Sequence, residues 1–469
     1  MADVIFEDAP EAGAEAEAQV VVVGAGAAGL TAALSARQAG AQVLLLERDA
    51  RPSGLTTMSQ GAVCAAGSRV QREAGIEDSP ERLIEDVRVK TGGTADPVMT
   101  RLIAEASGPV MDWLTDEVGL PYRVNPEWAG VFGHSVNRLH SLPSQTGAEM
   151  SARLLEACEA AGVRLACGAH VARLHAAPEG RIGAATVRRP DGREERIACS
   201  ALVAATCGFG ANREMVREHI PDFGRSPVYR HHGHEGNDGA GIRWGLALGA
   251  AAGSMDGFQG YGALAHPEAV LLNYNVFMDG GVQVNVRGAR FCDELADISG
   301  QGQRVLAQPE GIAWALFDAA REARAKDLAE YRDLLALGAV KAAEDVSAAA
   351  ERIGCEASAL AETLAAVEAA ARGEAADLFG RDFRGAAPLA PPYRLVRITG
   401  ALFHTQGGLQ LDAEGRVARA DGGVLPNFFA AGGTARGMSG SGSSGYLPAA
   451  GLASAVTLGR IAGRLAAAV

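Results

Sequence analysis

Residues 20–30 read Val-Val-Val-Val-Gly-Ala-Gly-Ala-Ala-Gly-Leu and decide the fold of this chain. The valine run followed by three spaced glycines predicts a buried strand, a tight turn and the start of a helix. A second apolar run, Val43 to Leu46, ends at the acidic residue Glu47. This spacing is typical of a strand–helix–strand unit that binds a dinucleotide at the N-terminus of its helix. Residues 19–48 therefore predict a Rossmann-like nucleotide-binding unit.

Each glycine of this turn has its own expected role. Gly24 permits the tight turn, Gly26 lets the backbone approach a pyrophosphate, and Gly29 lets the helix pack closely on the strand. Glu47 would accept a hydrogen bond from a ribose hydroxyl. The alternative is a chance helix start rich in Gly and Ala, in a chain that contains 60 glycines.

The composition fits a large soluble enzyme. A chain of 469 residues exceeds one ordinary core, so we expect at least two domains. Hydrophobic residues make up 48% and charged residues 21%, as in ordinary globular proteins. The net charge of −13 argues against nucleic acid and anionic membrane surfaces as partners.

The cysteines and the N-terminus indicate a cytoplasmic protein. The seven cysteines are scattered and form no Cys-x-x-Cys pair, so we expect no metal, haem or iron–sulfur site. Their distribution suits a reducing compartment. Residues 1–18 are acidic and alanine-rich, unlike a signal peptide, and are expected to be flexible. No apolar run is long enough to span a bilayer, so no membrane insertion is expected.

Periodicity organises the rest of the chain. Residues 145–160 predict a helix, and residues 162–197 predict short strands with a turn at Asp191-Gly192. The other predicted elements are a buried strand with a glycine turn at 201–210, a helical insert at 311–380, strand-like and glycine-rich sequence at 397–451, and a closing helix at 456–469. The Ser/Gly run 439–445 has the composition of a linker. Its position before an apolar helix instead favours a loop whose backbone lines a ligand-binding site.

Seven further motifs, taken together, carry a family resemblance. They are Gly54-Leu-Thr-Thr-Met-Ser-Gln-Gly61, Ala205-Thr-Cys-Gly-Phe-Gly-Ala-Asn212, Glu235-Gly-Asn-Asp-Gly-Ala-Gly-Ile242, Val284-Asn-Val-Arg-Gly-Ala-Arg-Phe291, Phe403-His-Thr-Gln-Gly-Gly408, Phe428-Phe-Ala-Ala-Gly-Gly433 and Leu458-Gly-Arg-Ile-Ala-Gly463. From Gln19 to the last helix the chain resembles the fumarate reductase and succinate dehydrogenase flavoprotein superfamily, in its soluble single-subunit branch. That branch also contains urocanate reductase-like, tricarballylate dehydrogenase-like and 3-ketosteroid Δ1-dehydrogenase-like enzymes.

The resemblance implies an α/β fold, in which a Rossmann-like FAD-binding domain carries an inserted, mobile α+β capping domain, with catalysis between the two. The expected boundaries are a flexible N-terminus at 1–18, the first part of the FAD-binding domain at 19–245, the capping domain at 246–384 and the second part of the FAD-binding domain at 385–469.

The resemblance also implies the cofactor contacts. Small residues after Glu47 lie along the pyrophosphate and the flavin, where larger side chains would take the cofactor's place. Asp238 is placed to contact FAD, although its Asp-Gly sequence also suits a plain turn. The family often has an acidic residue where Gly433 stands, so some contacts must differ. The expected FAD-binding residues are Gly24, Gly26, Ala27, Ala28, Gly29, Glu47, Arg48, Gly54, Thr56, Thr57, Ser59, Gly61, Val171, Thr206, Asp238, Gly432, Gly433, Ser443, Gly445 and Leu447.

Two features concern the state of the flavin. No histidine occupies the segment after Glu47 where covalent relatives carry one, so FAD is expected to be non-covalent. The Ser/Gly loop and the helix that follows would aim backbone N–H groups at the flavin pyrimidine edge. Such donors would stabilise negative charge on the reduced cofactor.

Three residues correspond to catalytic or substrate-binding positions of the family. Arg321 falls where the family's proton-donating arginine falls; the alternative is a solvated helix arginine beside Glu322 and Arg324. His404 matches the substrate-binding histidine of the His-Thr-x-Gly-Gly signature; the alternative is a structural histidine capping a turn. His266, followed by proline, resembles the start of the substrate segment, although His-Pro pairs are also common at turns.

The chain departs from the dicarboxylate pattern at two places. Residues 277–281 stand where those relatives carry Thr-Glu and a relay arginine, and that arginine is missing. Residues 445–448 stand where a second arginine clamps a carboxylate, and Arg436 lies nearby in a different register. Losing a bidentate arginine weakens carboxylate recognition, which argues against fumarate or succinate as the substrate.

Tyr446 indicates a different substrate chemistry. Its Tyr-x-Pro-Ala-x-Gly segment is similar to one in ketosteroid Δ1-dehydrogenase-like enzymes, where a tyrosine polarises a ketone. A phenol can donate to a developing enolate. The alternative is a tyrosine packed over the flavin without a chemical role. Tyr122 and Tyr261 are further pocket candidates that no motif supports.

The predicted function is FAD-dependent oxidoreduction of a CH–CH or C=C bond next to a carbonyl or carboxylate, with hydride exchange at flavin N5. Arg321 would carry the proton, and His404 and Tyr446 would hold the electron-withdrawing group. The alternatives are Δ1-dehydrogenase-like desaturation of a bulky ketone, an amine or hydroxy-acid oxidase, and a flavin-binding electron-transfer subunit. The expected partners are a small-molecule substrate and an unidentified electron donor or acceptor, because only one dinucleotide motif is present.

Overall fold

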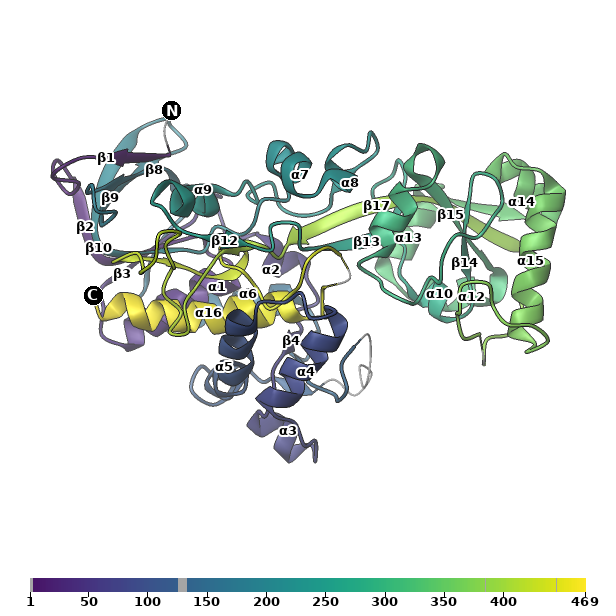
Figure 1. Cartoon of the computed structure of the whole chain (residues 1–469), viewed down its shortest axis with the longest axis horizontal. Coiled ribbons are helices and arrows are strands. Elements are labelled where there is room, and N and C mark those ends of the chain that lie inside the picture. Colours follow the sequence, from purple (N-terminus) through teal and green to yellow (C-terminus); the bar gives the residue numbers. More distant parts are fainter. Residues whose placement is uncertain (1–2, 125–132, 384, 444) are drawn as a thin grey trace. The chain divides into compact units, whose positions relative to one another are not determined.

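A computed structural model of the chain describes residues 3–124, 133–383, 385–443 and 445–469. It forms two compact units (Figure 1). Unit 1 comprises Met1–Met215, Gly233–Phe258 and His404–Val469, and unit 2 comprises Val216–His232 and Gln259–Phe403. The predicted boundaries at 245/246 and 384/385 differ from this division. The assignment of cofactor binding and capping to the two parts of the chain stays a prediction.

Unit 1 is built on an eight-stranded sheet with the order β1-β8-β9-β10-β2-β3-β7, in which β19 pairs with β10. The strands are β1 (Val4–Phe6), β2 (Ala16–Val23), β3 (Val43–Leu46), β7 (Arg164–Ala166), β8 (His170–Ala176), β9 (Ile182–Arg188), β10 (Glu194–Ala204) and β19 (Phe428–Ala430). The pairs β10–β2, β2–β3 and β3–β7 are parallel. Valines 20–23 are buried with the central strands, as expected for a parallel sheet covered on both faces.

The N-terminal segment holds regular structure that its composition did not predict. Strand β1 pairs in parallel with β8, and β2 begins at Ala16, before the apolar run. Backbone pairing with neighbouring strands orders this segment, and an acidic, alanine-rich composition carries no signal of such pairing.

Helices α1 (Ala27–Gln38) and α16 (Ala450–Ala467) lie side by side in unit 1 (Figure 1). A Cβ at Gly459 would stand 2.5 Å from the carbonyl oxygen of Ala28, and one at Gly463 would stand 2.2 Å from that of Ala32. Glycine is therefore required at both positions. Helix α16 begins six residues before the predicted start at 456, because Ala450 and Gly451 are compatible with a helix once α1 packs against it.

The remaining elements of unit 1 surround this core. They are α2 (Leu55–Met58), β4 (Val63–Cys64), α3 (Arg69–Glu73), α4 (Pro80–Lys90), α5 (Pro97–Asp116), β5 (Arg123–Val124), β6 (Leu139–Ser141), α6 (Gly147–Ala160), α9 (Ala240–Ala247), β12 (Ala252–Gly253), β18 (Gly408–Leu409) and η3 (Gly432–Thr434). Helix α7 (Arg213–His219) continues from unit 1 into unit 2. The predicted helix at 145–160 and the strands and turn at 162–197 agree with these elements.

Unit 2 is built on a six-stranded sheet, in which β17 pairs with β11, β13, β15 and β16. Its strands are β11 (Arg230–His231), β13 (Phe258–Ala265), β14 (Val282–Asn285), β15 (Ile312–Asp318), β16 (Val340–Ala343) and β17 (Tyr393–Thr405), of which β13 and β17 extend into unit 1. Its helices are α8 (Pro221–Gly224), α10 (Asn275–Met278), α11 (Gln301–Leu306), η2 (Pro309–Gly311), α12 (Ala319–Ala325), α13 (Ala329–Ala336), α14 (Val346–Ile353) and α15 (Ala357–Ala371).

The prediction of a helical insert over 311–380 is wrong at β15 and β16. Strand β15 is buried on both faces: Ala313, Ala315 and Phe317 join one apolar cluster, whereas Trp314 and Leu316 join another. A strand covered on both faces shows an unbroken apolar run rather than alternation, so its period cannot be distinguished from that of a short helix.

Candidate cofactor and active site

The glycine turn after β2 is fixed by backbone packing. Gly24 has φ of +102°, and a Cβ there would stand 2.4 Å from the carbonyl oxygen of Ala205. A Cβ at Gly29 would stand 1.7 Å from the carbonyl oxygen of Gly24. At Gly26 the nearest atom is the hydroxyl of Thr56, 3.5 Å away. Gly26 is thus the position of the three with open space beside it.

That open position lies at the N-terminus of α1. Gly26 is the N-cap and offers no side chain to cap the helix, while Ala27 N–H donates to Thr56 Oγ1 at 2.9 Å. The next N–H groups of the first turn, those of Ala28 and Gly29, have no acceptor within the helix. Free donors beside an open space form a site that fits a pyrophosphate.

Glu47 lies directly beside this turn. Its carboxylate accepts hydrogen bonds from Ala25 N–H at 2.8 Å and from Asp49 N–H at 3.0 Å, and its side chain is partly exposed. A carboxylate offers about four lone-pair positions, so Glu47 can still accept a ribose hydroxyl. Arg48 contacts Asp49 at 3.4 Å, and His234 contacts the same carboxylate at 3.0 Å.

In the segment from Gly54 to Gly61, the hydroxyls of Thr57 and Ser59 donate to backbone carbonyls of the segment itself. Thr57 donates to the carbonyl of Gly54 at 2.8 Å, and Ser59 donates to that of Thr56 at 2.7 Å. The N–H of Gly61 donates to Ser59 Oγ at 3.1 Å. Because the protons of both hydroxyls are used within the loop, Thr57 and Ser59 could meet a cofactor through their backbone or as acceptors. A Cβ at Gly54 would meet no atom within 4 Å.

Thr206 and Asp238 both act on the start of α9. Thr206 Oγ1 accepts a hydrogen bond from Gly241 N–H at 3.0 Å, and Asp238 Oδ1 accepts one from Ala240 N–H at 2.8 Å. Gly239 caps the helix with φ of +79°. The turn geometry that was the alternative for Asp238 is therefore present, and its contact with FAD stays a prediction.

The remaining expected cofactor residues come from three places in unit 1. Gly432 has φ of +61° and lies against the start of α1, since a Cβ there would stand 3.0 Å from that of Ala28. A Cβ at Gly433 would stand 2.7 Å from the backbone nitrogen of Gly208. The others are Val171, buried in β8, and Ser443, Gly445 and Leu447, which precede α16.

The Ser/Gly loop closes on itself before α16. Gly440 N–H donates to the carbonyl of Gly445 at 3.2 Å, and residue 444 of this loop lies outside the described residues. Ala449, with φ of +64°, precedes α16 and its own side chain does not cap that helix. Its first N–H groups already have partners: that of Ala450 donates to the carbonyl of Leu447 at 3.1 Å, and that of Gly451 donates to the hydroxyl of Tyr446.

The structure brings His404 and Tyr446 together within unit 1. Their ring centroids lie 5.6 Å apart, in an edge-to-face arrangement of 78°. Gln406 Nε2 lies 2.7 Å from His404 Nδ1. Desolvation lowers the pKa of His404 to about 4, so the imidazole is neutral near pH 7. Burial raises the pKa of Tyr446 well above its ordinary value, so the phenol keeps its proton.

Arg321 has a different environment, in unit 2. It is 4% exposed, and each guanidinium nitrogen donates: Nη1 to Asp318 at 2.5 Å, Nε to the carbonyl of Asp279 at 2.9 Å, and Nη2 to that of Ala387 at 2.5 Å. It lines a pocket of about 420 Å³ together with Arg324 and Arg381. Arg321 is therefore a buried, ion-paired residue, unlike the solvated helix arginine that was the alternative.

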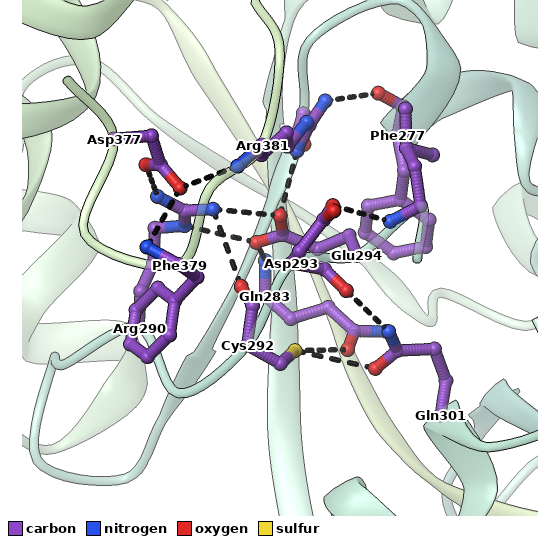
Figure 2. A network of polar contacts seen from close by, with 12 residues as sticks. Phe277, Gln283, Arg290, Cys292, Asp293, Glu294, Gln301, Asp377, Phe379 and Arg381 are labelled. Atoms are coloured by element: carbon purple, nitrogen blue, oxygen red, sulfur yellow. Dashed lines mark hydrogen bonds and ion pairs between the residues drawn. The ribbon is translucent and has the colours of Figure 1, made fainter. Parts of the chain in front are cut away.

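A buried charge network in unit 2 joins Arg290 and Glu294 to Asp377 and Arg381 (Figure 2). Glu294 accepts hydrogen bonds from Arg381 at 2.7 Å and from Arg290 at 2.9 Å, and Arg290 also pairs with Asp377 at 2.5 Å. Glu294 is fully buried. Arg290 and Glu294 are four residues apart, but their partners Asp377 and Arg381 lie 87 positions further along the chain. Sequence reasoning did not find the network because no pattern joins the two segments.

The structure places the weaker candidates as follows. His266 lies in unit 2, where burial lowers its pKa. Tyr261 donates to the carbonyl of Leu272 at 2.8 Å, and the buried hydroxyl of Tyr122 has no hydrogen-bond partner among the described residues. Arg436 is paired with Asp96 at 2.8 Å, so its guanidinium is already engaged with a carboxylate.

Comparisons with known proteins identify the family and the fold. Residues 19–453 match the FAD binding domain family. The NADH:fumarate oxidoreductase of Klebsiella pneumoniae (strain 342) is 28% identical over 452 residues, which cover 96% of this chain and 47% of that protein. The chain thus spans about half the length of this relative.

Two solved structures are similar in fold. The open conformation of a flavocytochrome c3 fumarate reductase matches with a TM-score of 0.82 and 27% identity, covering 98% of this chain and 80% of the other. The 3-ketosteroid-Δ4-(5α)-dehydrogenase of Rhodococcus jostii RHA1, in complex with 4-androstene-3,17-dione, matches with a TM-score of 0.78 and 26% identity, covering 98% and 99%.

The chain therefore belongs to the FAD binding domain family, and within it to the fumarate reductase and succinate dehydrogenase flavoprotein superfamily. It is an FAD-dependent oxidoreductase with an α/β, Rossmann-like fold, as the sequence predicted. In the ranges that the structure describes, no helix has the length and apolar character that crossing a membrane requires.

Proposed function

We propose that the protein transfers hydride to or from a C–C bond that is activated by an adjacent ketone-type carbonyl. The observation that carries this proposal is the pairing of His404 with Tyr446. Both side chains keep their protons as neutral groups near pH 7, and their rings lie 5.6 Å apart. Two neutral donors on neighbouring rings suit a carbonyl oxygen that gains negative charge during the reaction.

In this proposal the cofactor is non-covalent FAD, held by the glycine turn, Glu47 and the segment 54–61. Bound FAD supplies the hydride exchange. His404 and Tyr446 orient the substrate by donating to its carbonyl oxygen, and they stabilise the enolate that forms when the neighbouring C–H bond is made or broken. Donors that are positioned in advance spend little energy on reorganisation during the reaction.

The environment of the arginines favours a neutral carbonyl over a dicarboxylate. A carboxylate substrate requires an unpaired cation for bidentate binding. Arg321 is paired with Asp318, and Arg436 with Asp96. At either arginine, a carboxylate substrate would share the positive charge with a carboxylate that is already bound, which weakens its binding.

A second candidate is fumarate reductase-like reduction of a carboxylate-activated double bond, with Arg321 delivering the proton. Two observations favour it: the position of Arg321 within the family motif, and the 28% identity with an NADH:fumarate oxidoreductase. The third possibility, an electron-transfer subunit, requires a redox partner and no turnover of small molecules.

The test is anaerobic stopped-flow spectroscopy of the purified, FAD-loaded protein. The flavin is reduced with dithionite and mixed with a simple enone, a steroidal 4-ene-3-ketone or fumarate. Rapid reoxidation by an enone, lost in His404→Phe and Tyr446→Phe, would support the proposal. Reoxidation by fumarate alone would favour the second candidate, and no reoxidation by any of the three would favour the electron-transfer subunit.

Unit 1 is proposed to be the FAD-binding domain and unit 2 the capping domain. The electron donor or acceptor is proposed to be a separate small molecule or protein, and the compartment to be the cytoplasm. The proposal of the cytoplasm is supported by the cysteines, which are free in the described structure, as suits a reducing compartment.

A further inference from the structure

Beside His404 lies a chain of two polar side chains that the family motif does not define. Gln406 Nε2 is 2.7 Å from His404 Nδ1, and the hydroxyl of Ser439 donates to Gln406 Oε1 at 2.9 Å. Gln406 is 4% exposed and Ser439 is 2% exposed. Both therefore lie in a dry environment, where hydrogen-bond partners decide which atoms carry protons.

The backbone holds Gln406 in place. Its N–H donates to the carbonyl of Gly257 at 2.8 Å, and its own carbonyl accepts from Gly437 N–H at 3.0 Å. With the backbone fixed on both sides, the side-chain amide has few ways to reach the ring of His404. The contact is thus part of the fold of unit 1 rather than a chance surface contact.

We propose that Gln406, oriented by Ser439, is a positioning residue that fixes His404 as the Nε2–H tautomer. A neutral imidazole has one donor nitrogen and one acceptor nitrogen. The amide nitrogen of Gln406 can only donate, so Nδ1 must be the acceptor and Nε2 must carry the proton. Nε2 is then the nitrogen that can donate to a substrate carbonyl.

The role of Nε2 toward substrate rests on the proposed function, whereas the tautomer does not. The titratable group that lies against the ring among the described residues is Tyr446, which stays neutral near pH 7. No charge from this neighbour competes with Gln406, and the other hydrogen-bond partner of the ring is the backbone of Thr405, an acceptor for the protonated nitrogen. If the amide were reversed, Nδ1 would carry the proton and Nε2 would accept, which is unsuited to holding a carbonyl oxygen.

The experiment measures the tautomer directly, by NMR of the FAD-loaded protein with ¹⁵N-labelled histidine. The signal of His404 is assigned from its loss in His404→Phe. We expect an unprotonated Nδ1 and a protonated Nε2. In Gln406→Leu we expect a mixture of tautomers, and in Ser439→Ala a smaller shift in the same direction. Gln410→Leu and Ser454→Ala are the matched controls, and should leave the signal unchanged.

Gln406→Glu provides a second variant that preserves side-chain size. A carboxylate beside Nδ1 would favour the imidazolium and raise the pKa of His404. The pH profile of kcat/KM should then gain a titration between pH 5 and 8 that the parent lacks, where neutral histidine ordinarily titrates. Gln406→Leu should lower kcat/KM roughly tenfold, with a larger effect on kcat than on KM.

A protonated Nδ1 in the parent protein would overturn the proposal, as would an unchanged tautomer in both Gln406 variants. These NMR outcomes do not depend on which substrate is turned over. If every enone fails as a substrate while the tautomer responds to Gln406, the proposed function fails and the positioning role stands. If enones are reduced and the tautomer does not change in the Gln406 variants, the proposed function stands and the positioning role fails.

Discussion

Two sites that the sequence singled out by motif or family position behave differently in the folded chain. The turn at 24–29 in unit 1 is shaped by contacts between backbone atoms, because a Cβ at Gly29 would stand only 1.7 Å from the carbonyl oxygen of Gly24. The start of α12 in unit 2, which carries Arg321, is shaped by side chains, because Arg321 is held by Asp318 and by the carbonyls of Asp279 and Ala387.

The difference shows which kind of motif can be interpreted from sequence. A glycine motif encodes a steric requirement that its own neighbours impose, so its geometry follows from the sequence. An arginine in a motif encodes a charge whose use depends on which acceptors the fold brings to it. Arg321 matches a catalytic position by sequence, yet in unit 2 its donors are already engaged.

The largest expected effect is at the glycine turn. Gly29→Val should prevent folding, because its side chain would overlap the carbonyl of Gly24. Gly26→Leu should fold, because the nearest atom to a Cβ at Gly26 is the hydroxyl of Thr56, 3.5 Å away. The variant should lack FAD, because the leucine side chain would fill the space proposed for the pyrophosphate. Circular dichroism and the visible flavin spectrum after purification separate the two outcomes. A yellow Gly26→Leu protein would contradict the assignment of the pyrophosphate site.

Arg321→Ala should lower the free energy of unfolding by about 3 kcal/mol, because it leaves the buried carboxylate of Asp318 unpaired. FAD should remain bound, and turnover should be lost only if Arg321 delivers the proton, as in the second candidate function. Denaturant unfolding of the FAD-loaded protein measures the first effect, and steady-state kinetics measures the last. Arg321→Lys is the informative control: full stability with no turnover would assign Arg321 to proton transfer, whereas restored turnover would restrict it to structure.

Arg436→Met should destabilise the protein by about 1.5 kcal/mol, through loss of the ion pair with Asp96 and the hydrogen bond to Gln410. The KM of the preferred substrate should not change, because the guanidinium is engaged within unit 1. Thermal unfolding and steady-state kinetics test both statements. A large rise in KM with unchanged stability would instead make Arg436 the carboxylate clamp.

The smallest expected effect concerns pH. Burial lowers the pKa of His140 to about 4 from an ordinary value of 6.5, so the unfolded chain binds a proton between these values that the folded chain does not. The contribution of neutral His140 to the free energy of unfolding is therefore fully present above pH 6.5 and is lost as the pH falls toward 4. His140 should account for about 1 kcal/mol of the loss between pH 7.5 and 5.5. A His140→Gln variant with an unchanged pH slope in thermal unfolding would contradict this.

The sequence predicted much of the fold and less of the candidate site. The strand–turn–helix unit, the helix at α6 and the class of the protein followed from periodicity and motifs. Strand β15 was missed because both of its faces are buried, which removes the alternation that reveals a strand. The pairing of Gln406 with Ser439 was missed because a hydrogen bond between residues distant in sequence leaves no pattern in either segment.

The sequence by itself determined that this chain folds around a nucleotide turn and belongs to a flavoprotein family, because steric requirements and motif spacing are local properties. The tertiary structure decided the environments of the reactive side chains. It placed His404 against Tyr446 and Gln406, and it buried Arg321 against Asp318. Protonation and charge depend on which groups meet in space, and that information arises only when distant segments of the chain pack together.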